Sequence, residues 1–233
     1  MNGKINSIET LGTLDGPGIR YVVFMQGCSL RCKYCHNPET WDMTGKSTEI
    51  SATDLVNQIL KYKNYFGTDG GVTFSGGEPL LQPEFLLECL KLCKQHNINT
   101  CIDTAGVGFG DYKEILKYVD LVILDIKAVD DNEYQNLTGK TNSQFSQFLK
   151  QVIECNNKLW LRQVIVPGIN NTKEHVLKFK EFAKGINNVQ NIELLPYKTI
   201  GVQKYKELNI NYPLENVKDL SQEELDYLNT FLK

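Results

Sequence analysis

Three cysteines lie close together near the start of the chain, and their spacing suits the binding of a metal centre. Cys28, Cys32 and Cys35 fall within eight residues, in the pattern Cys-x3-Cys-x2-Cys. Soft thiolate ligands suit iron–sulfur clusters and zinc. A closed zinc site or an ordinary cubane cluster takes four protein ligands, and this loop supplies three. His36 directly follows Cys35 and is poorly placed to reach the same metal, so the spacing predicts one coordination position for another ligand.

The residues before this motif predict a strand that leads into a loop. Tyr21–Met25 is an apolar run typical of a buried strand, and Gly27 lets the backbone turn away from it. A loop can wrap three sulfurs around one centre, whereas a strand points alternate side chains to opposite faces. The sequence therefore predicts a metal-binding loop that follows the first buried strand.

The composition is that of an ordinary folded protein and argues against nucleic-acid or membrane binding. The chain has 233 residues, a net charge of −3 and a pI near 5.7, which disfavour general affinity for nucleic acid or anionic membranes. No stretch approaches the ~20 apolar residues of a membrane span, and Met1–Asp15 lacks the apolar core of a secretory signal. We expect a single domain over residues 1–233 in the cytoplasm, where thiols stay reduced and clustered cysteines bind metal.

The other four cysteines form no second metal-binding motif. Cys89 and Cys93 lie one turn apart in a predicted helix without a third partner nearby. Cys101 lies in a predicted strand, and Cys155 ends a predicted helix. Free cysteine is a common small core residue, so we expect one metal centre.

Apolar, β-branched runs alternate six times with segments of helical periodicity. This alternation predicts an α/β fold with a mainly parallel sheet and right-handed crossovers. Six units predict a sheet curled into an incomplete (β/α)6 barrel, whose reactive groups gather at the carboxyl ends of the strands. The predicted strands are Tyr21–Met25, Val72–Ser75, Asn99–Ile102, Leu121–Ile126, Trp160–Val166 and Asn191–Leu195. The predicted helices are Ala52–Tyr65, Pro83–His96, Tyr112–Tyr118, Asn132–Leu137, Ser143–Cys155, Lys173–Lys184 and Gln222–Leu232.

Small and polar residues stand where the second and third predicted strands end. Gly76, Gly77 and Glu78 follow the second strand. Two glycines allow close backbone approach to a ligand, but they also suit a plain strand-to-helix turn. Asp103 and Thr104 follow the third strand, and a carboxylate beside a hydroxyl suits ribose, ammonium or cation binding.

Charged residues end or interrupt the later strands. Asp125 and Lys127 lie on the same face by two-residue alternation, and Arg162 lies within the fifth strand. A charge in such a buried run must be exposed, paired or functional. Asp125 and Lys127 therefore form a salt bridge at the barrel rim or bind a ligand. Arg162 pairs with an acidic neighbour or binds a carboxylate or ribose.

These motifs together carry a family resemblance. The cysteine pattern, with Tyr34 before the third cysteine, resembles the signature of the radical S-adenosylmethionine (SAM) enzymes. The preceding Asp15-Gly16-Pro17-Gly18-Ile19-Arg20 and the following His36-Asn37-Pro38 resemble the members that activate glycyl-radical enzymes, most closely those acting on pyruvate formate-lyase. The resemblance extends from about Ile5 to beyond Tyr197.

The resemblance implies a fold and a chemistry. The fold is the incomplete barrel already expected, and the three cysteines hold three irons of one [4Fe-4S] cluster. SAM chelates the fourth iron through its amino and carboxylate groups. The reduced cluster cleaves SAM to methionine and a 5′-deoxyadenosyl radical, which takes a hydrogen from a glycine Cα of a partner protein.

The resemblance also implies roles for individual residues. It implies SAM binding by Tyr34, His36, Asn37, Gly77, Asp103, Asp125, Lys127, Arg162 and Lys198. It implies a monovalent cation, Na⁺ or K⁺, held by Asp103, Thr104 and Asp125. It places at the barrel mouth, against the substrate peptide, Asp15, Gly16, Pro17 and Gly18. The chain departs from the family at Lys198, where related enzymes carry His, and at Ala105, where they carry Asn or Ser.

Three alternatives remain open at the level of sequence. A non-catalytic iron–sulfur or zinc-binding module for electron transfer explains the thiols but leaves the strand-end acids without a role. An activator of another glycyl-radical enzyme usually carries an insert with extra cysteines, and none occurs between Cys35 and Ser75. A SAM enzyme for a small molecule resembles the chain less around Asp15–Arg20. The resemblance therefore favours pyruvate formate-lyase as the partner, with flavodoxin or ferredoxin as the electron donor.

Overall fold

One curled sheet carries the architecture of the protein. The computed structural model describes residues 1–232, which form an eight-stranded sheet in the order β3-β1-β2-β4-β5-β6-β7-β8. Its six consecutive parallel strands are β2 (Arg20–Met25), β4 (Gly71–Gly76), β5 (Asn99–Thr104), β6 (Leu121–Asp125), β7 (Lys158–Ile165) and β8 (Val189–Pro196). Within the described residues β8 does not pair with β2 or β3, so the barrel is incomplete, as predicted.

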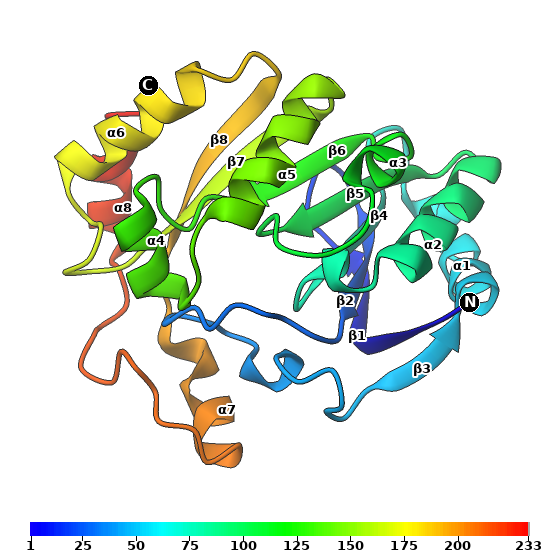
Figure 1. Ribbon diagram of the computed structural model, residues 1–233, viewed down its shortest axis with the longest axis horizontal. Helices are drawn as coiled ribbons and strands as arrows, with labels where there is room; N and C mark the ends of the chain where they lie inside the picture. Colours follow the sequence, from blue (N-terminus) through cyan, green and yellow to red (C-terminus); the bar gives the residue numbers. More distant parts are fainter. Residues whose placement is uncertain (233) are drawn as a thin grey trace.

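Helices connect the parallel strands and cover the outside of the sheet (Figure 1). The α-helices are α1 (Ala52–Leu60), α2 (Pro83–Gln95), α3 (Tyr112–Leu116), α4 (Asp131–Thr138), α5 (Ser143–Glu154), α6 (Lys173–Lys184), α7 (Val202–Glu207) and α8 (Gln222–Asn229). Short 3-10 turns are Pro38–Thr40, Lys63–Tyr65, Pro79–Leu81 and Thr199–Gly201. The predicted strands and helices are confirmed to within a few residues, except that Ala52–Tyr65 divides into α1 and a separate turn.

Two antiparallel strands extend the sheet where the sequence predicted none. β1 (Asn2–Gly12) pairs with β2, and β3 (Thr48–Ser51) pairs with β1. Both are partly exposed and lack the continuous apolar run of a buried parallel strand. α7 was missed for a related reason, since Tyr205 is its one buried residue.

The two faces of the sheet separate the core from the site. Residues pointing outward, such as Val122 and Leu124, join the large core beneath the helices. Along β5, β6 and β7 the inward-pointing residues are apolar in the first part of the strand and charged towards its carboxyl end. The apolar inner positions are Cys101, Leu121, Ile123 and Trp160, which form their own cluster. Two residues further along each strand the inward-pointing positions are Asp103, Asp125 and Arg162. Because side chains alternate between the two faces, these charges lie together at the carboxyl end of the barrel.

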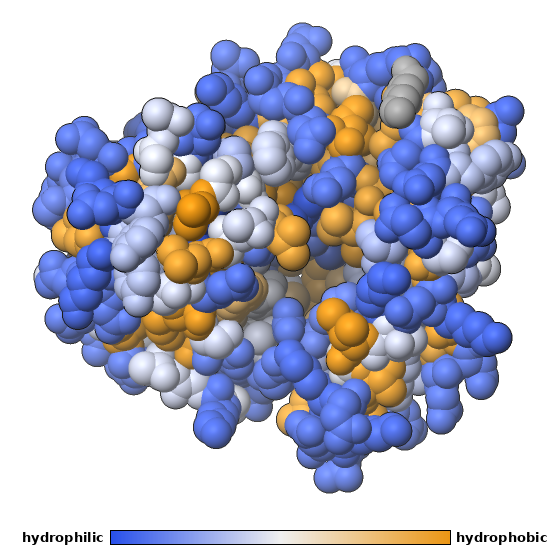
Figure 2. All heavy atoms as spheres, turned by 180° about the vertical axis from the view of Figure 1, so that it is seen from behind, coloured by the Kyte–Doolittle hydropathy of each residue, from blue (hydrophilic) through white to orange (hydrophobic). Residues whose placement is uncertain are grey.

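The surface contains both hydrophilic and hydrophobic residues. In the view from behind, hydrophilic residues are spread over the molecule and apolar ones gather around a central hollow (Figure 2). Among residues 1–232 no helix has the length and apolar character that crossing a membrane requires.

Phe148 tests the packing of α5 against the sheet. Its ring is fully buried and meets Tyr112 edge-on, with ring centres 5.2 Å apart. We expect Phe148→Ala to lower the free energy of unfolding by about 3–5 kcal/mol, because it leaves a cavity in the core. Ile153→Ala on the same helix, where the side chain is 40% exposed, serves as the control and should cost less than about 1 kcal/mol. Equal effects in denaturant titrations would contradict this packing.

Candidate active site at the carboxyl ends of the strands

The cysteine loop follows β2 and is fixed by its own backbone. Gly27 adopts a left-handed φ of +100° and donates its N–H to the Thr40 carbonyl at 2.7 Å. The Cys28 N–H reaches the Trp41 carbonyl at 3.2 Å. On the other side, Arg31 donates its N–H to the Thr138 carbonyl at the end of α4, at 2.8 Å. The loop is therefore held between the turn that follows it and α4.

The three thiols of this loop are a suitable donor set for a cluster. Cys32 is buried, and Cys28 and Cys35 are partly buried. Burial raises the pKa of all three, to about 12 for Cys28 and about 11 for Cys32, and repulsion from neighbouring thiols adds to the rise at Cys28 and Cys32. A bound metal centre removes this penalty, because its positive charge favours the thiolate form.

The number of thiols matches a cluster that has three protein ligands. A cubane contains four irons, and each cysteine would bind a different one. Three thiols in one loop would leave the fourth iron open to another ligand.

The glycine-rich turn after β4 packs directly on the base of the cysteine loop. Gly77 donates its N–H to the Met25 carbonyl at 2.9 Å, and the Glu78 N–H reaches the Gly27 carbonyl at 2.8 Å. A Cβ atom on Gly77 would lie 2.2 Å from the Gly27 oxygen, which is main chain and cannot swing away. Position 77 therefore requires glycine, and the predicted SAM-binding turn lies beside the predicted cluster ligands.

Glu78 connects this turn to the end of β5. Its carboxylate is fully buried and accepts hydrogen bonds from the Thr104 hydroxyl at 2.5 Å and the Ala105 N–H at 2.9 Å. Burial raises its pKa to about 7, although the hydrogen bonds lower it. Glu78 thus fixes the glycine-rich turn against the end of β5.

An ion-pair network joins the ends of β5, β6 and β7. Arg162 contacts Asp103 at 2.6 Å and Asp125 at 3.4 Å, and the Ser75 hydroxyl donates to Asp103 at 2.9 Å. Lys127 pairs with Asp125 at 3.0 Å. For Arg162 the sequence predicted either an acidic neighbour or a ligand, and the structure shows two acidic neighbours. For Asp125 and Lys127 it predicted either a salt bridge or a ligand, and the structure shows the salt bridge.

The charges in this network set one another's protonation. Burial opposes ionisation of Asp103 and raises its pKa, although Arg162 opposes the rise. Burial acts on Asp125 in the same direction, but the attractions of Lys127 and Arg162 together outweigh it, and its pKa is lowered. Lys127 also lies over the Tyr34 ring, 5.5 Å from its centre, which brings the network to the cysteine loop.

The segment Asp15–Gly18 precedes β2, and its contact with a substrate peptide stays a prediction. The Thr73 hydroxyl donates to the Asp15 carbonyl at 2.7 Å, and a Cβ on Gly16 would lie 3.5 Å from Ile123 Cδ1 on the inside of the sheet. Arg20 holds the following turn, because its side chain binds β4 and β5 near their starts. Burial and the charge of Asp103 raise the pKa of Asp15 to about 6, while Arg162 opposes the rise.

The chain after β8 folds back onto the cysteine loop. The His36 ring contacts the Lys198 carbonyl at 2.8 Å, and Lys204 in α7 donates to the Asn37 side chain at 2.8 Å. The Lys198 ammonium itself turns towards the Leu220 carbonyl, at 3.3 Å. Lys204 is a contact that sequence reasoning missed, since a lysine in a short polar helix carries no motif.

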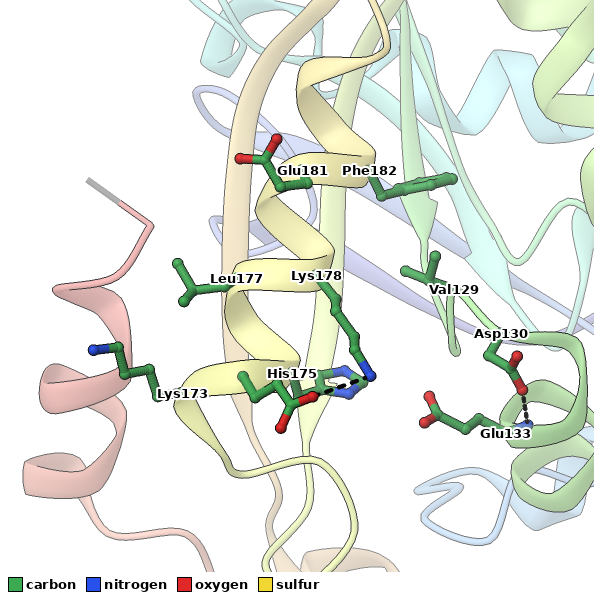
Figure 3. Close-up of a pocket in the computed structure, with 10 residues that line it drawn as sticks. Val129, Asp130, Glu133, Lys173, His175, Leu177, Lys178, Glu181 and Phe182 are labelled. Atoms are coloured by element: carbon green, nitrogen blue, oxygen red, sulfur yellow. Dashed lines mark hydrogen bonds and ion pairs between the residues drawn. The ribbon is translucent and has the colours of Figure 1, made fainter.

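A large cavity lies elsewhere, between α4 and α6. Its volume is about 920 Å³, with Val129, Asp130 and Glu133 on one side and residues of α6 on the other (Figure 3). A smaller cavity of about 250 Å³ shares Glu133 and His175 with it and extends to Lys127. Lys127, which is predicted to bind the cofactor, therefore lines this smaller cavity.

Glu78 gives the site a testable pH dependence. Because the folded pKa is raised from 4.5 to about 7, the folded protein keeps a proton that the unfolded chain loses between these values. The stability contributed by this group is complete below pH 4.5 and is lost as the pH rises through 7. We expect the free energy of unfolding of the cluster-free protein, measured by urea titration, to fall by roughly 3 kcal/mol over this interval.

Glu78→Gln should have a smaller slope than the wild type, because its amide does not titrate and only other groups with raised pKa values, such as Asp15, remain. Glu174→Gln is the control, since that side chain is 81% exposed, and it should keep the slope of the wild type. Identical slopes for the wild type and Glu78→Gln would contradict the raised pKa.

Comparisons with known proteins agree with this geometry. The model of the radical SAM superfamily matches residues 22–183. A pyruvate formate-lyase-activating enzyme from Clostridium pasteurianum is 53% identical over 232 residues, which are 99% of this chain and 97% of the relative. The enzyme of the same description from Staphylococcus epidermidis is 45% identical and covers 94% of this chain and 90% of its own.

Solved structures show the same fold. A domain of a pyruvate formate-lyase-activating enzyme from Bacteroides vulgatus has a TM-score of 0.56 at 26% identity, covering 70% of this chain and 92% of that one. Streptococcus suis SuiB bound to its precursor peptide SuiA has a TM-score of 0.68 at 18% identity, covering 91% of this chain and 44% of that one, a likeness of fold alone. From the family model and these near-full-length relatives, the chain belongs to the radical SAM superfamily and, within it, to the family of pyruvate formate-lyase-activating enzymes.

Proposed function

We propose that this protein activates pyruvate formate-lyase by generating a glycyl radical on it. The observation that carries the proposal is the contact between two loops, the three-cysteine loop after β2 and the glycine-rich turn after β4. The 53% identity to a pyruvate formate-lyase-activating enzyme, over nearly the whole of both chains, supports the choice of partner.

Cys28, Cys32 and Cys35 would hold the [4Fe-4S] cluster, and the surrounding strand ends would hold SAM. When bound together, cluster and SAM supply a one-electron cleavage that yields methionine and a 5′-deoxyadenosyl radical, which takes the hydrogen of a glycine Cα. The SAM-binding set that we propose is Tyr34, His36, Asn37, Gly77, Asp103, Asp125, Lys127, Arg162 and Lys198.

The residues of the chain would orient SAM and would keep water away from the radical. The Gly77 backbone, pressed against Gly27, leaves no side chain between the turn and a ligand. Arg162 would offer a buried cation to the carboxylate or ribose of SAM, while Asp103 and Asp125 keep the guanidinium in place. A primary-carbon radical attacks most C–H bonds, so selectivity depends on holding one glycine beside it and excluding water.

We also propose a monovalent cation, Na⁺ or K⁺, beside Asp103 and Asp125. The two carboxylates repel each other, and Arg162 sits between them as their shared partner. Thr104 is the third proposed ligand; its hydroxyl donates to Glu78 and accepts the Gly106 N–H, which leaves one lone pair for a cation.

Replacing Na⁺ and K⁺ by choline at constant ionic strength tests the cation. We expect the dissociation constant of SAM to rise severalfold, because Arg162 and Lys127 alone then balance the two carboxylates, and to recover when either ion is restored. Equilibrium binding of SAM to the cluster-loaded protein measures the effect. An unchanged constant in choline would exclude the cation.

For the electron donor we propose a flavodoxin or a ferredoxin, as the family resemblance implies. The setting that we propose is the cytoplasm. The seven cysteines are all free thiols, which supports a reducing compartment.

Electron paramagnetic resonance on the anaerobic protein tests the proposed function. Cluster-loaded enzyme mixed with SAM, a reductant and pyruvate formate-lyase should give a glycyl-radical doublet that requires every component. SAM cleavage without the doublet would retain the radical chemistry and discard the partner. A loaded cluster that neither cleaves SAM nor gives the doublet would indicate an electron-transfer module.

Cys32→Ala should abolish both SAM cleavage and the doublet, because two thiols do not hold the cluster. Cys155→Ala is the matched control, since this exposed cysteine lies outside the loop and should leave iron content and activity unchanged. Full SAM cleavage by Cys32→Ala would show that the ligand assignment is wrong.

A further inference from the structure

Lys204 lies on α7, and its ammonium contacts the loop that carries the three cysteines. It donates to the Asn37 Oδ1 atom at 2.8 Å and forms an ion pair with Glu39, residues that lie 167 and 165 positions earlier in the chain. The side chains of Lys204 and Glu39 are 39% and 28% exposed, so the ion pair by itself adds little to stability. What the contact provides is a defined geometry at Asn37, two residues after the last cysteine.

The start of α7 packs against the main chain of this loop. A Cβ atom on Gly201 would lie 2.8 Å from the His36 Cα and 3.2 Å from the Cys35 oxygen, so no side chain fits between the two segments. Tyr205 is fully buried and meets Trp41 edge-on, with ring centres 5.7 Å apart. The helix that carries the ammonium is therefore held at a fixed distance from the loop.

The two acceptors of this ammonium are held from the other side, by the residue that follows β2. The buried Gln26 side chain donates to the Glu39 carbonyl at 2.9 Å. The Thr40 N–H and hydroxyl both donate to the Asn37 carbonyl, at 3.0 and 2.8 Å. The ammonium thus meets two acceptors whose backbone positions are set by other contacts.

A lysine at this place determines which way the Asn37 amide faces. An ammonium has three donors and no acceptor, so the amide meets it with the Oδ1 atom. A hydroxyl in its place would both donate and accept and would allow either orientation of the amide. With Oδ1 turned to Lys204, the NH2 group faces away from the lysine and is available to a ligand. Position 37 therefore offers a hydrogen-bond donor, which matches an acceptor nitrogen or oxygen.

We propose that Lys204 is a positioning residue, which orients the Asn37 amide so that its NH2 group donates to an acceptor atom in the adenosine part of SAM. The inference rests on the proposed function, because it takes Asn37 to be a SAM ligand. Lys204 acts through Asn37 and touches neither SAM nor the cluster in this assignment.

A double-mutant cycle on SAM binding tests the proposal. Lys204→Met keeps the length of the side chain but loses the ammonium, and Asn37→Ala loses the amide. In the cluster-loaded protein we expect each single variant to raise the dissociation constant of SAM about five- to tenfold, the effect of one lost hydrogen bond. In the Asn37→Ala background, Lys204→Met should add no more than about twofold, because the group that it orients is gone.

Two further variants separate orientation of the amide from attachment of α7. Asn37→Asp still accepts from Lys204 but has no NH2 group, so it should weaken SAM binding as much as Asn37→Ala does. Glu39→Gln removes the ion pair and keeps the contact with Asn37, so it should bind SAM within about twofold of the wild type. Equal losses in Glu39→Gln and Lys204→Met would reduce Lys204 to an attachment of α7 and overturn the proposal.

Lys204→Arg and Lys206→Met complete the design. Arginine also has donors only, so Lys204→Arg should recover most of the affinity that Lys204→Met loses. Lys206 is an exposed residue of the same helix, and Lys206→Met should bind SAM as the wild type does.

The wild type separates this proposal from the proposed function. A cluster-loaded wild type that does not bind SAM would overturn both. A wild type that binds SAM and forms the glycyl radical, with effects of Lys204→Met and Asn37→Ala that multiply in the double variant, would retain the function and overturn the role of Lys204.

Discussion

Charges buried inside a curled sheet are stable only where each meets an opposite charge or a full set of hydrogen bonds, and this constraint organises the protein. Arg162 on β7 contacts Asp125 on the neighbouring strand and Asp103 on the strand beyond it. The pairs form only in one register, because a shift of a single residue would turn these side chains to the opposite face. The ion pairs therefore fix three strand ends relative to one another.

The same constraint appears at both ends of the barrel with different solutions. At the carboxyl ends opposite charges pair. The buried Glu78 carboxyl accepts hydrogen bonds from Thr104 and Ala105, and its raised pKa reduces the fraction that is charged. At the amino ends, Arg20 is satisfied by neutral acceptors alone. Between them lies the apolar cluster around Ile123, which separates the two polar regions. The inside of the barrel is thus layered, polar at each end and apolar between.

The sequence predicted what depends on local pattern. Alternation within strands placed Asp125 and Lys127 on one face, where they form the salt bridge. The β1 and β3 strands were not predicted, because an edge strand needs one buried face and a partner that lies far along the chain. The hydrogen bond from Thr73 to the Asp15 carbonyl was not predictable either, because the two residues lie 58 positions apart in the chain.

The close approach of Gly77 to Gly27 limits how these two loops can change. Main chain faces main chain there, so any side chain at position 77 would push the glycine-rich turn away from the cysteine loop. The distance between the two loops is therefore set by main chain alone, and any substitution that adds a Cβ at position 77 would increase it.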